Sequence, residues 1–120
     1  MHDLPTLFSQ NAPGVHDVEI NVIDEKGDGG AYHQYLVRSG KKDAQLIRFQ
    51  KGPVNEAGLN GLTQEALLAI VEHRLECFQQ GDFASDYNAE ALGFVRYALS
   101  ALHRRTQDRM NRNVEGTSRR

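Results

Sequence analysis

"LLAIVEHRLECFQQGDFASDYNAEALGFVRYAL", residues 67–99, decides the fold of this chain. Within it, the short polar stretch 81–86 separates two segments whose apolar residues recur every three or four positions. That spacing is typical of amphipathic helices, and a glycine such as Gly81 commonly ends one. A connection this short forces the two helices to run antiparallel. The stretch therefore predicts a helix hairpin.

The first helix of the hairpin is predicted to begin after Thr63, whose hydroxyl can cap it, and to run to about Gln80. At 100° per residue, four apolar side chains fall within about 80° of one another. They are Leu67, Val71, Leu75 and Phe78. Glu72 and Glu76 have the spacing of a solvated helix face rather than of an acid/base dyad.

The second helix is predicted from about Tyr87 to about Asn111, and it has two apolar sides. The stripe expected to pack inside the protein is Leu92, Val95, Leu99, Leu102 and Thr106. Phe94, Tyr97 and Ala101 lie on nearly the opposite side of the helix. A helix with two apolar sides in so small a protein needs a second partner, and the simplest one is another copy of the chain. We therefore expect a homo-oligomer.

The N-terminal half has the patterns of a small sheet. Residues 1–14 show no apolar period and are expected to be an irregular lead-in. Residues 15–52 are expected to form an antiparallel β meander of about three strands, the first of which alternates Val18, Ile20 and Val22 with polar residues. With the hairpin at 62–112 and a tail at 113–120, the chain of 120 residues is expected to be a single α+β domain.

Positive charge gathers at the C-terminal end of a chain whose net charge is −2. From residue 96 to residue 120 there are seven arginines against two acids, which favours a local anionic partner. On the helical wheel Arg109 falls about 20° beyond the inward stripe and Arg105 about 60° beyond it. Arg104 points away and can pair with Asp108. Arginines at an apolar margin need an anion, either a carboxylate or a ligand.

No catalytic or metal constellation is found in the sequence. The five histidines are scattered without a pair at ligand spacing, and Cys77 is expected to be buried filler rather than a reactive thiol. The "GDGG" stretch at residues 27–30 lacks the lysine and the helix of a phosphate loop, so it is expected to be a turn. The sequence predicts no enzyme, no metal and no cofactor.

No apolar run approaches the length of a membrane span, and the first five residues do not resemble a secretory signal. A cytosolic protein is therefore expected.

The side chains near the hairpin ends suit a nucleotide. The guanidinium groups of Arg105 and Arg109 match phosphate oxygens and also stack on rings. Phe78 can stack on a base while Asn88 bonds its edge. Three simpler interpretations stay open: Phe78 as a core side chain, Asn88 as a helix cap, and the arginines as a solvated basic end.

Residues 47–117 contain the loop "GPVNEAGLNG", the helix end "FQQG" and the tail "RTQDRMNRNVEGT". In their order and spacing these motifs resemble those of the phage Thoeris anti-defence proteins, which share a helix-hairpin domain with phage anti-CBASS proteins. The tail departs from the family by carrying Asn113 where a glycine is usual, and asparagine also tolerates a left-handed helix end.

The resemblance implies a sponge rather than an enzyme. Family members sequester cyclic ADP-ribose isomers, such as glycocyclic ADP-ribose, which bacterial TIR-domain proteins make during infection. The protein would then act in the cytoplasm of the infected host. The family's pocket residues match Phe78, Asn88, Arg105 and Arg109, with the adenine between Phe78 and Arg105 and the pyrophosphate on Arg109. Thr117 is a further candidate for a phosphate contact.

Some relatives assemble as hexamers and also bind cyclic di- or trinucleotides at separate sites, so a dimer and a trimer of dimers both stay open. Two other functions are alternatives to the sponge. One is a nucleic-acid-binding regulator, whose affinity would fall steeply with salt. The other is a phage accessory protein with only protein partners, in which Phe78→Ala would destabilise the fold without affecting binding.

Overall fold

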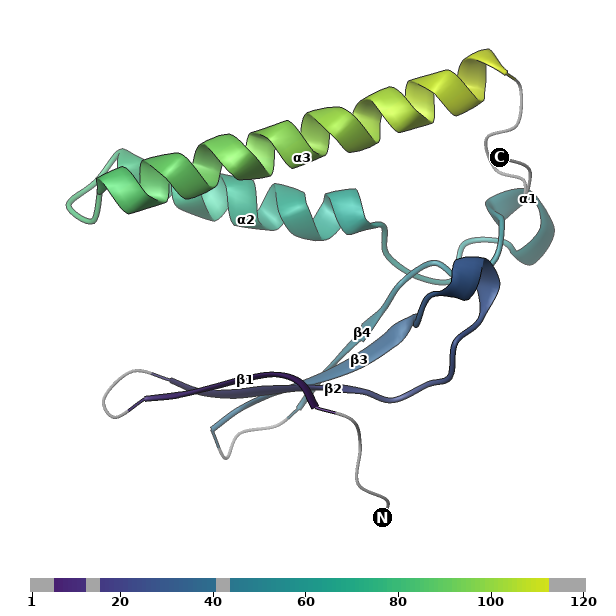
Figure 1. The fold of residues 1–120 in the computed structure, drawn as a ribbon, viewed down its shortest axis with the longest axis horizontal. Coiled ribbons are helices and arrows are strands. Elements are labelled where there is room, and N and C mark those ends of the chain that lie inside the picture. Colours follow the sequence, from purple (N-terminus) through teal and green to yellow (C-terminus); the bar gives the residue numbers. More distant parts are fainter. Residues whose placement is uncertain (1–5, 13–15, 41–43, 113–120) are drawn as a thin grey trace. The chain divides into compact units, whose positions relative to one another are not determined.

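The computed structural model describes residues 6–12, 16–40 and 44–112, and it divides the chain into two compact units (Figure 1). The first unit holds an antiparallel sheet and the loop that follows it, and the second holds a helix hairpin. A short helix, α1 (Val54–Ala57), lies in the connection. The tail 113–120, with Thr117, lies outside the described residues. The α+β class expected from the sequence is confirmed.

The sheet has four strands in the order β1, β2, β3, β4, all antiparallel to their neighbours (Figure 1). They are β1 (Thr6–Ala12), β2 (His16–Val22), β3 (Gln34–Ser39) and β4 (Gln45–Arg48). Part of the expected lead-in is therefore a strand. β1 is an edge strand that pairs with β2 through its backbone, and its Leu7 and Phe8 are exposed. Backbone pairing needs no apolar alternation, so the missing period did not exclude a strand.

The centre of the sheet buries a polar side chain. Asn21, one of the polar residues that alternate with Val18, Ile20 and Val22, is only 1% exposed. Its amide donates to Thr6 Oγ1 at 3.4 Å and Glu19 Oε2 at 3.2 Å, and its Oδ1 accepts from Arg38 at 2.8 Å. Because β2 lies between β1 and β3, side chains from both neighbours cover Asn21 and satisfy its hydrogen bonds.

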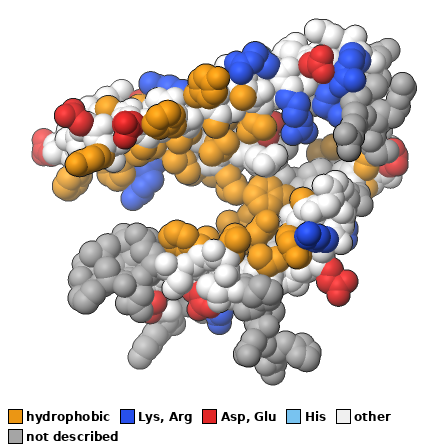
Figure 2. Space-filling model, viewed as in Figure 1, with side chains coloured by type: hydrophobic (Ala, Val, Ile, Leu, Met, Phe, Trp, Pro, Cys, Tyr) orange, Lys and Arg blue, Asp and Glu red, His pale blue; other side chains and the backbone are white. Residues whose placement is uncertain are grey.

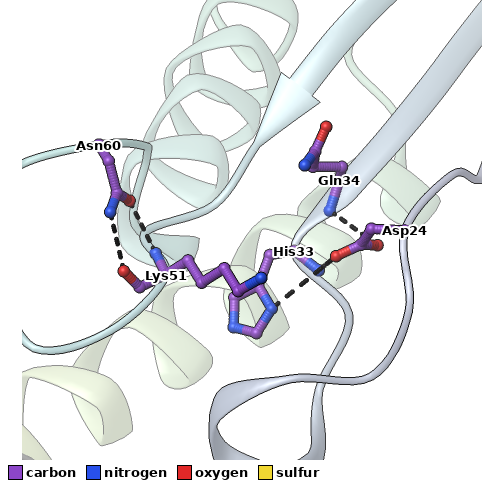
Figure 3. Close-up of polar contacts among 5 residues, drawn as sticks. All are labelled: Asp24, His33, Gln34, Lys51 and Asn60. Carbon is purple, nitrogen blue, oxygen red and sulfur yellow. Dashed lines mark hydrogen bonds and ion pairs between the residues drawn. The ribbon is translucent and has the colours of Figure 1, made fainter. Parts of the chain in front are cut away.

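Asp24 holds the start of β3 in place after the turn that follows β2 (Figure 3). Its two carboxylate oxygens accept the backbone N–H groups of His33 at 2.9 Å and Gln34 at 3.2 Å. The intervening 3-10 turn, η1 (Asp28–Gly30), contains Gly29 and Gly30 at positive φ, as expected for a turn and not a phosphate loop. One carboxylate thus fixes the return of the chain into the sheet.

We expect Asp24→Ala to lower the stability of the sheet unit by about 1–3 kcal/mol, because two partly buried N–H donors lose their charged acceptor. Amide hydrogen exchange of β3 measures this loss locally. Glu25→Ala is the matched control, since Glu25 is an exposed neighbour. Equal exchange rates in the two variants would show that the Asp24 contacts contribute nothing.

The loop after β4 is closed by Asn60, whose side chain makes two hydrogen bonds to the backbone of Lys51 (Figure 3). Asn60 Oδ1 accepts from the Lys51 N–H, and its amide donates to the Lys51 carbonyl, each at 2.8 Å. Beside it, a Cβ on Gly61 would collide with the backbone carbonyl group of Phe49. The backbone therefore passes too closely at Gly61 for any side chain, which explains the glycine after Asn60.

The second unit is the predicted hairpin, α2 (Gln64–Gln79) followed by α3 (Asp86–Asn111), with the helices antiparallel (Figure 1). Thr63 caps α2 by accepting the Ala66 N–H at 3.1 Å, as predicted. Gly81 follows the end of α2, but its φ is not in the left-handed region. The predicted inward stripe of α3 is confirmed: Leu92 is 7% exposed, and Val95, Leu99, Leu102 and Thr106 are half-buried.

The two helices are also joined by charge. Arg96 of α3 donates from Nε to Glu72 Oε2 at 3.3 Å and from a terminal nitrogen to Glu76 Oε2 at 2.6 Å. Both glutamates, predicted to be a solvated face, are half-buried instead. Their spacing of one helical turn allows both carboxylates to contact the guanidinium group of Arg96, which links α2 to α3.

The outward side of α3 is apolar, as the sequence predicted. Phe94 and Tyr97 are each 70% exposed, and Tyr87 is also exposed. Figure 2 shows apolar side chains on the face of the hairpin that is turned to the viewer, and basic side chains toward the C-terminal end of α3. None of the described helices is long and apolar enough to cross a membrane.

Candidate functional site

The C-terminal turns of α3 carry the arginines, and the structure distinguishes them by their partners. Arg104 donates to Ser100 Oγ at 2.7 Å, whereas the sequence had suggested that it pairs with Asp108. Asp108 pairs with Arg112 instead, at 3.1 Å. Asp108 lies one helical turn from both Arg104 and Arg112, so it can pair with either of them, and in the structure it pairs with Arg112. The guanidinium groups of Arg104 and Arg112 therefore each contact a side chain at the same end of α3.

Arg105 and Arg109 lie where the helical wheel placed them. Arg109 is half-buried at the edge of the inward stripe, and Arg105 is exposed beside it. One turn separates them, so both guanidinium groups can reach the same anion. Within the described part of the chain, Arg105 has no ion-pair partner. This end of α3 is thus the cationic part of the candidate site.

The aromatic part of the candidate site lies at the hairpin turn. Phe78 is half-buried at the end of α2, and the Phe83 ring meets it edge-on with the centroids 6.2 Å apart. The guanidinium of Arg74 lies over the Phe78 ring at 4.9 Å. Asn88 donates from its amide to the Phe83 carbonyl at 3.3 Å. Phe83, in the turn, therefore contacts both the Phe78 ring and the Asn88 amide and joins them into one cluster.

Asn88 is not the cap of α3, which excludes one of the simpler interpretations. Ser85 is the cap, and its Oγ accepts the Asn88 N–H at 3.0 Å. Because its side chain is not used in capping, Asn88 keeps an amide oxygen as an acceptor for the edge of a base.

Arg74 and Phe83 are contacts of the candidate site that the sequence did not indicate. Arg74 precedes Phe78 by one helical turn, a spacing that brings the two side chains together and that does appear in the sequence. Phe83 belongs to the irregular turn, where no periodicity predicts the direction of a side chain.

The aromatic and cationic parts are far apart within one chain. Asn88 and Arg105 stand on the same helix, so a rise of 1.5 Å per residue places them about 25 Å apart along it. Phe78 belongs with Asn88 at the turn, and Arg109 lies beyond Arg105. A small cyclic nucleotide is much shorter than this separation. One chain alone cannot bring all four side chains to one ligand.

Comparisons with known proteins agree with the hairpin described above. The model of the Acb2/Tad1 hairpin domain matches residues 41–107, which include Phe78, Asn88 and Arg105. The chain is also 40% identical, over 91 residues, to the Thoeris anti-defense 1 protein of Bacillus phage SBSphiJ7. That alignment covers 76% of this chain and 64% of the relative, so the chain spans a little under two thirds of the relative's length.

Proposed function

Since the chain belongs to the Acb2/Tad1 hairpin family, we propose that it is a phage anti-defence protein that binds and sequesters a cyclic ADP-ribose-type nucleotide and leaves it intact. The main support for this proposal is the similarity over 91 residues to a protein named for Thoeris anti-defence. The proposed place of action is the cytoplasm of the infected bacterium, where TIR-domain proteins make the signal. No catalytic step is proposed.

The proposed contacts follow from the chemistry of the two clusters. A cyclic ADP-ribose isomer has a flat adenine and a diphosphate. Phe78 and Arg105 suit the two faces of the adenine, and Asn88 suits its hydrogen-bonding edge. Arg109 suits the diphosphate, because its fork binds two oxygens at once. Thr117 is proposed as an additional phosphate contact.

We propose that the complete site is shared between two copies of the chain, because one chain separates its halves by about 25 Å. Two α3 helices that run antiparallel, with Asn88 opposite the other copy's Arg105, have their two-fold axis near residues 96 and 97. Phe94 and Tyr97, each 70% exposed, lie at that place. The outward apolar side of α3 thus fits a self-complementary contact that assembles two sites.

A sponge must bind its signal tightly, and a shared site supports that requirement. Nanomolar affinity corresponds to about −12 kcal/mol. A stacked base contributes about 1–3 kcal/mol, and each charge-assisted hydrogen bond to phosphate about 1.5–3 kcal/mol. These contributions reach the requirement only in a closed, pre-organised pocket. Enclosure between two helices of different copies supplies more contact area than one exposed helix end.

The proposed function is tested by calorimetric titration of the protein with cyclic ADP-ribose isomers, followed by chromatography of the released ligand. We expect binding near nanomolar affinity with the ligand recovered unchanged, and only a small loss of affinity as salt is raised. Recovery of a hydrolysed product would contradict sequestration. Absence of heat with every isomer would contradict this ligand class, and cyclic di- and trinucleotides would be titrated next. Binding only to DNA or RNA, with a steep salt dependence, would identify a nucleic-acid regulator.

A further inference from the structure

The loop that follows β4 contains an asparagine directly before a glycine, Asn60–Gly61, and the proposed nucleotide site does not use this pair. In such a pair the backbone nitrogen of the glycine can attack the side-chain carbonyl carbon of the asparagine, because glycine has no side chain to hinder the approach. Both residues are exposed, so water reaches them. Within the described part of the chain, the Gly61 N–H makes no hydrogen bond, so its nitrogen can act as the nucleophile.

The hydrogen bonds of Asn60 oppose this attack. Its side-chain oxygen accepts the Lys51 N–H and its amide donates to the Lys51 carbonyl, each at 2.8 Å (Figure 3). The backbone N–H of Asn60 donates to Gln50 Oε1 at 3.0 Å, and the Gln50 amide donates to the Gly58 carbonyl at 2.7 Å. The carboxamide of Asn60 is therefore bound through both its oxygen and its nitrogen. Both bonds must break before it can turn toward the Gly61 nitrogen.

We propose that Asn60 is a deamidation site whose reactivity is controlled by these hydrogen bonds. In the first step a bond forms between Gly61 N and Asn60 Cγ, and the bond from Cγ to Nδ2 breaks. The Gly61 N–H proton passes through solvent to the leaving nitrogen, which departs as ammonia. Water then opens the five-membered imide at either of its carbonyl groups and gives aspartate or isoaspartate at position 60. The reaction needs water alone as co-reactant, and no group is oxidised or reduced.

Neither product preserves the contacts that close the loop. An aspartate at position 60 still accepts the Lys51 N–H, but it has no N–H group to donate to the Lys51 carbonyl. Two oxygens would then face each other. An isoaspartate adds a carbon to the backbone directly before Gly61, where the chain already passes against the carbonyl group of Phe49. Deamidation therefore removes the contacts that had limited it.

The test incubates the full chain at neutral pH and measures deamidation of Asn60 by peptide mass spectrometry. The reference is the same chain in denaturant, where the hydrogen bonds of the loop are absent. We expect Asn60 to deamidate about tenfold more slowly in the folded chain, because two hydrogen bonds must open first. Asn111, which precedes an arginine, is the internal control and should change little in either sample. Equal rates at Asn60 in the folded and denatured chains, or no deamidation in denaturant, would overturn the proposal.

Gln50→Ala is the informative variant, because it loosens the loop without changing Asn60 or Gly61. We expect its Asn60 to deamidate severalfold faster than in wild type while circular dichroism shows a folded chain. Gln45→Ala is the matched control, since Gln45 is an exposed glutamine of β4, and its rate should equal that of wild type. A folded Gln50→Ala variant that reacts no faster than Gln45→Ala would contradict control by the loop. If Gln50→Ala does not fold, the folded and denatured wild-type rates still decide.

Discussion

Replacing Arg109 with alanine is expected to weaken binding of the cyclic ADP-ribose isomer by about 10- to 150-fold. The variant removes the proposed charge-assisted hydrogen bonds to the diphosphate, worth about 1.5–3 kcal/mol, and each 1.4 kcal/mol is tenfold in affinity. Arg109 is half-buried, so its loss also leaves the anion without a partly desolvated counter-charge. Calorimetric titration of wild type and variant measures the change directly.

Arg104→Ala is the matched control for Arg109→Ala. Arg104 stands on the same helix end, but its guanidinium is directed to Ser100. We expect its loss to change the affinity by less than about threefold, as for a screened surface charge. Equal losses in the two variants would indicate a diffuse basic surface rather than a defined diphosphate contact.

A mixing experiment tests whether the site is shared between copies. Phe78→Ala and Arg109→Ala are each expected to bind poorly, since each damages every site. In a mixed pair, one site has both substitutions and the other has neither. Mixing the two variants should therefore restore tight binding at about one quarter of the sites when subunits exchange at random. If the mixture binds no better than either variant alone although subunits exchange, the site lies within one chain.

Leu92→Ala is expected to have the largest effect on stability, lowering the free energy of unfolding of the hairpin by about 2–5 kcal/mol. Leu92 is 7% exposed on the inward side of α3, so truncation leaves a cavity between α3 and α2. Denaturant unfolding followed by far-ultraviolet circular dichroism measures the loss, because most helical residues belong to these two helices.

The control for Leu92→Ala is Ile70→Ala, which removes a side chain of the same size. Ile70 is 64% exposed on α2, and alanine is the better helix former. Its effect is expected to stay within about 0.5 kcal/mol. Similar losses at the two positions would show that burial in the hairpin is not what makes Leu92 important.

Local sequence patterns were sufficient to predict the helix hairpin. The cap at Thr63, the polar turn at 81–86 and the inward stripe of α3 all act between residues a few positions apart. Such contacts are encoded by spacing and residue type, so they can be read from the chain directly. The motifs of residues 47–117 identified the family for the same reason, since they preserve order and spacing.

Non-local pairing decided the sheet. β1 depends on backbone hydrogen bonds to β2, and Asn21 is buried because Thr6 and Arg38 arrive from neighbouring strands. Neither fact leaves a periodic signal in the residues concerned. Strand pairing joins segments that are distant in sequence, so its outcome depends on which edges meet.

The sequence by itself determined the antiparallel hairpin, the cap at Thr63 and the family, and it suggested the types of side chain for the proposed nucleotide contacts. Only the tertiary structure placed the Phe83 ring against Phe78 and assigned Glu72 and Glu76 to Arg96. It also placed Cys77, which was expected to be buried filler, on the exposed surface of α2 beside His73. The physical reason is that residue type defines what a group can bind, whereas distance and competing neighbours define which groups can bind together.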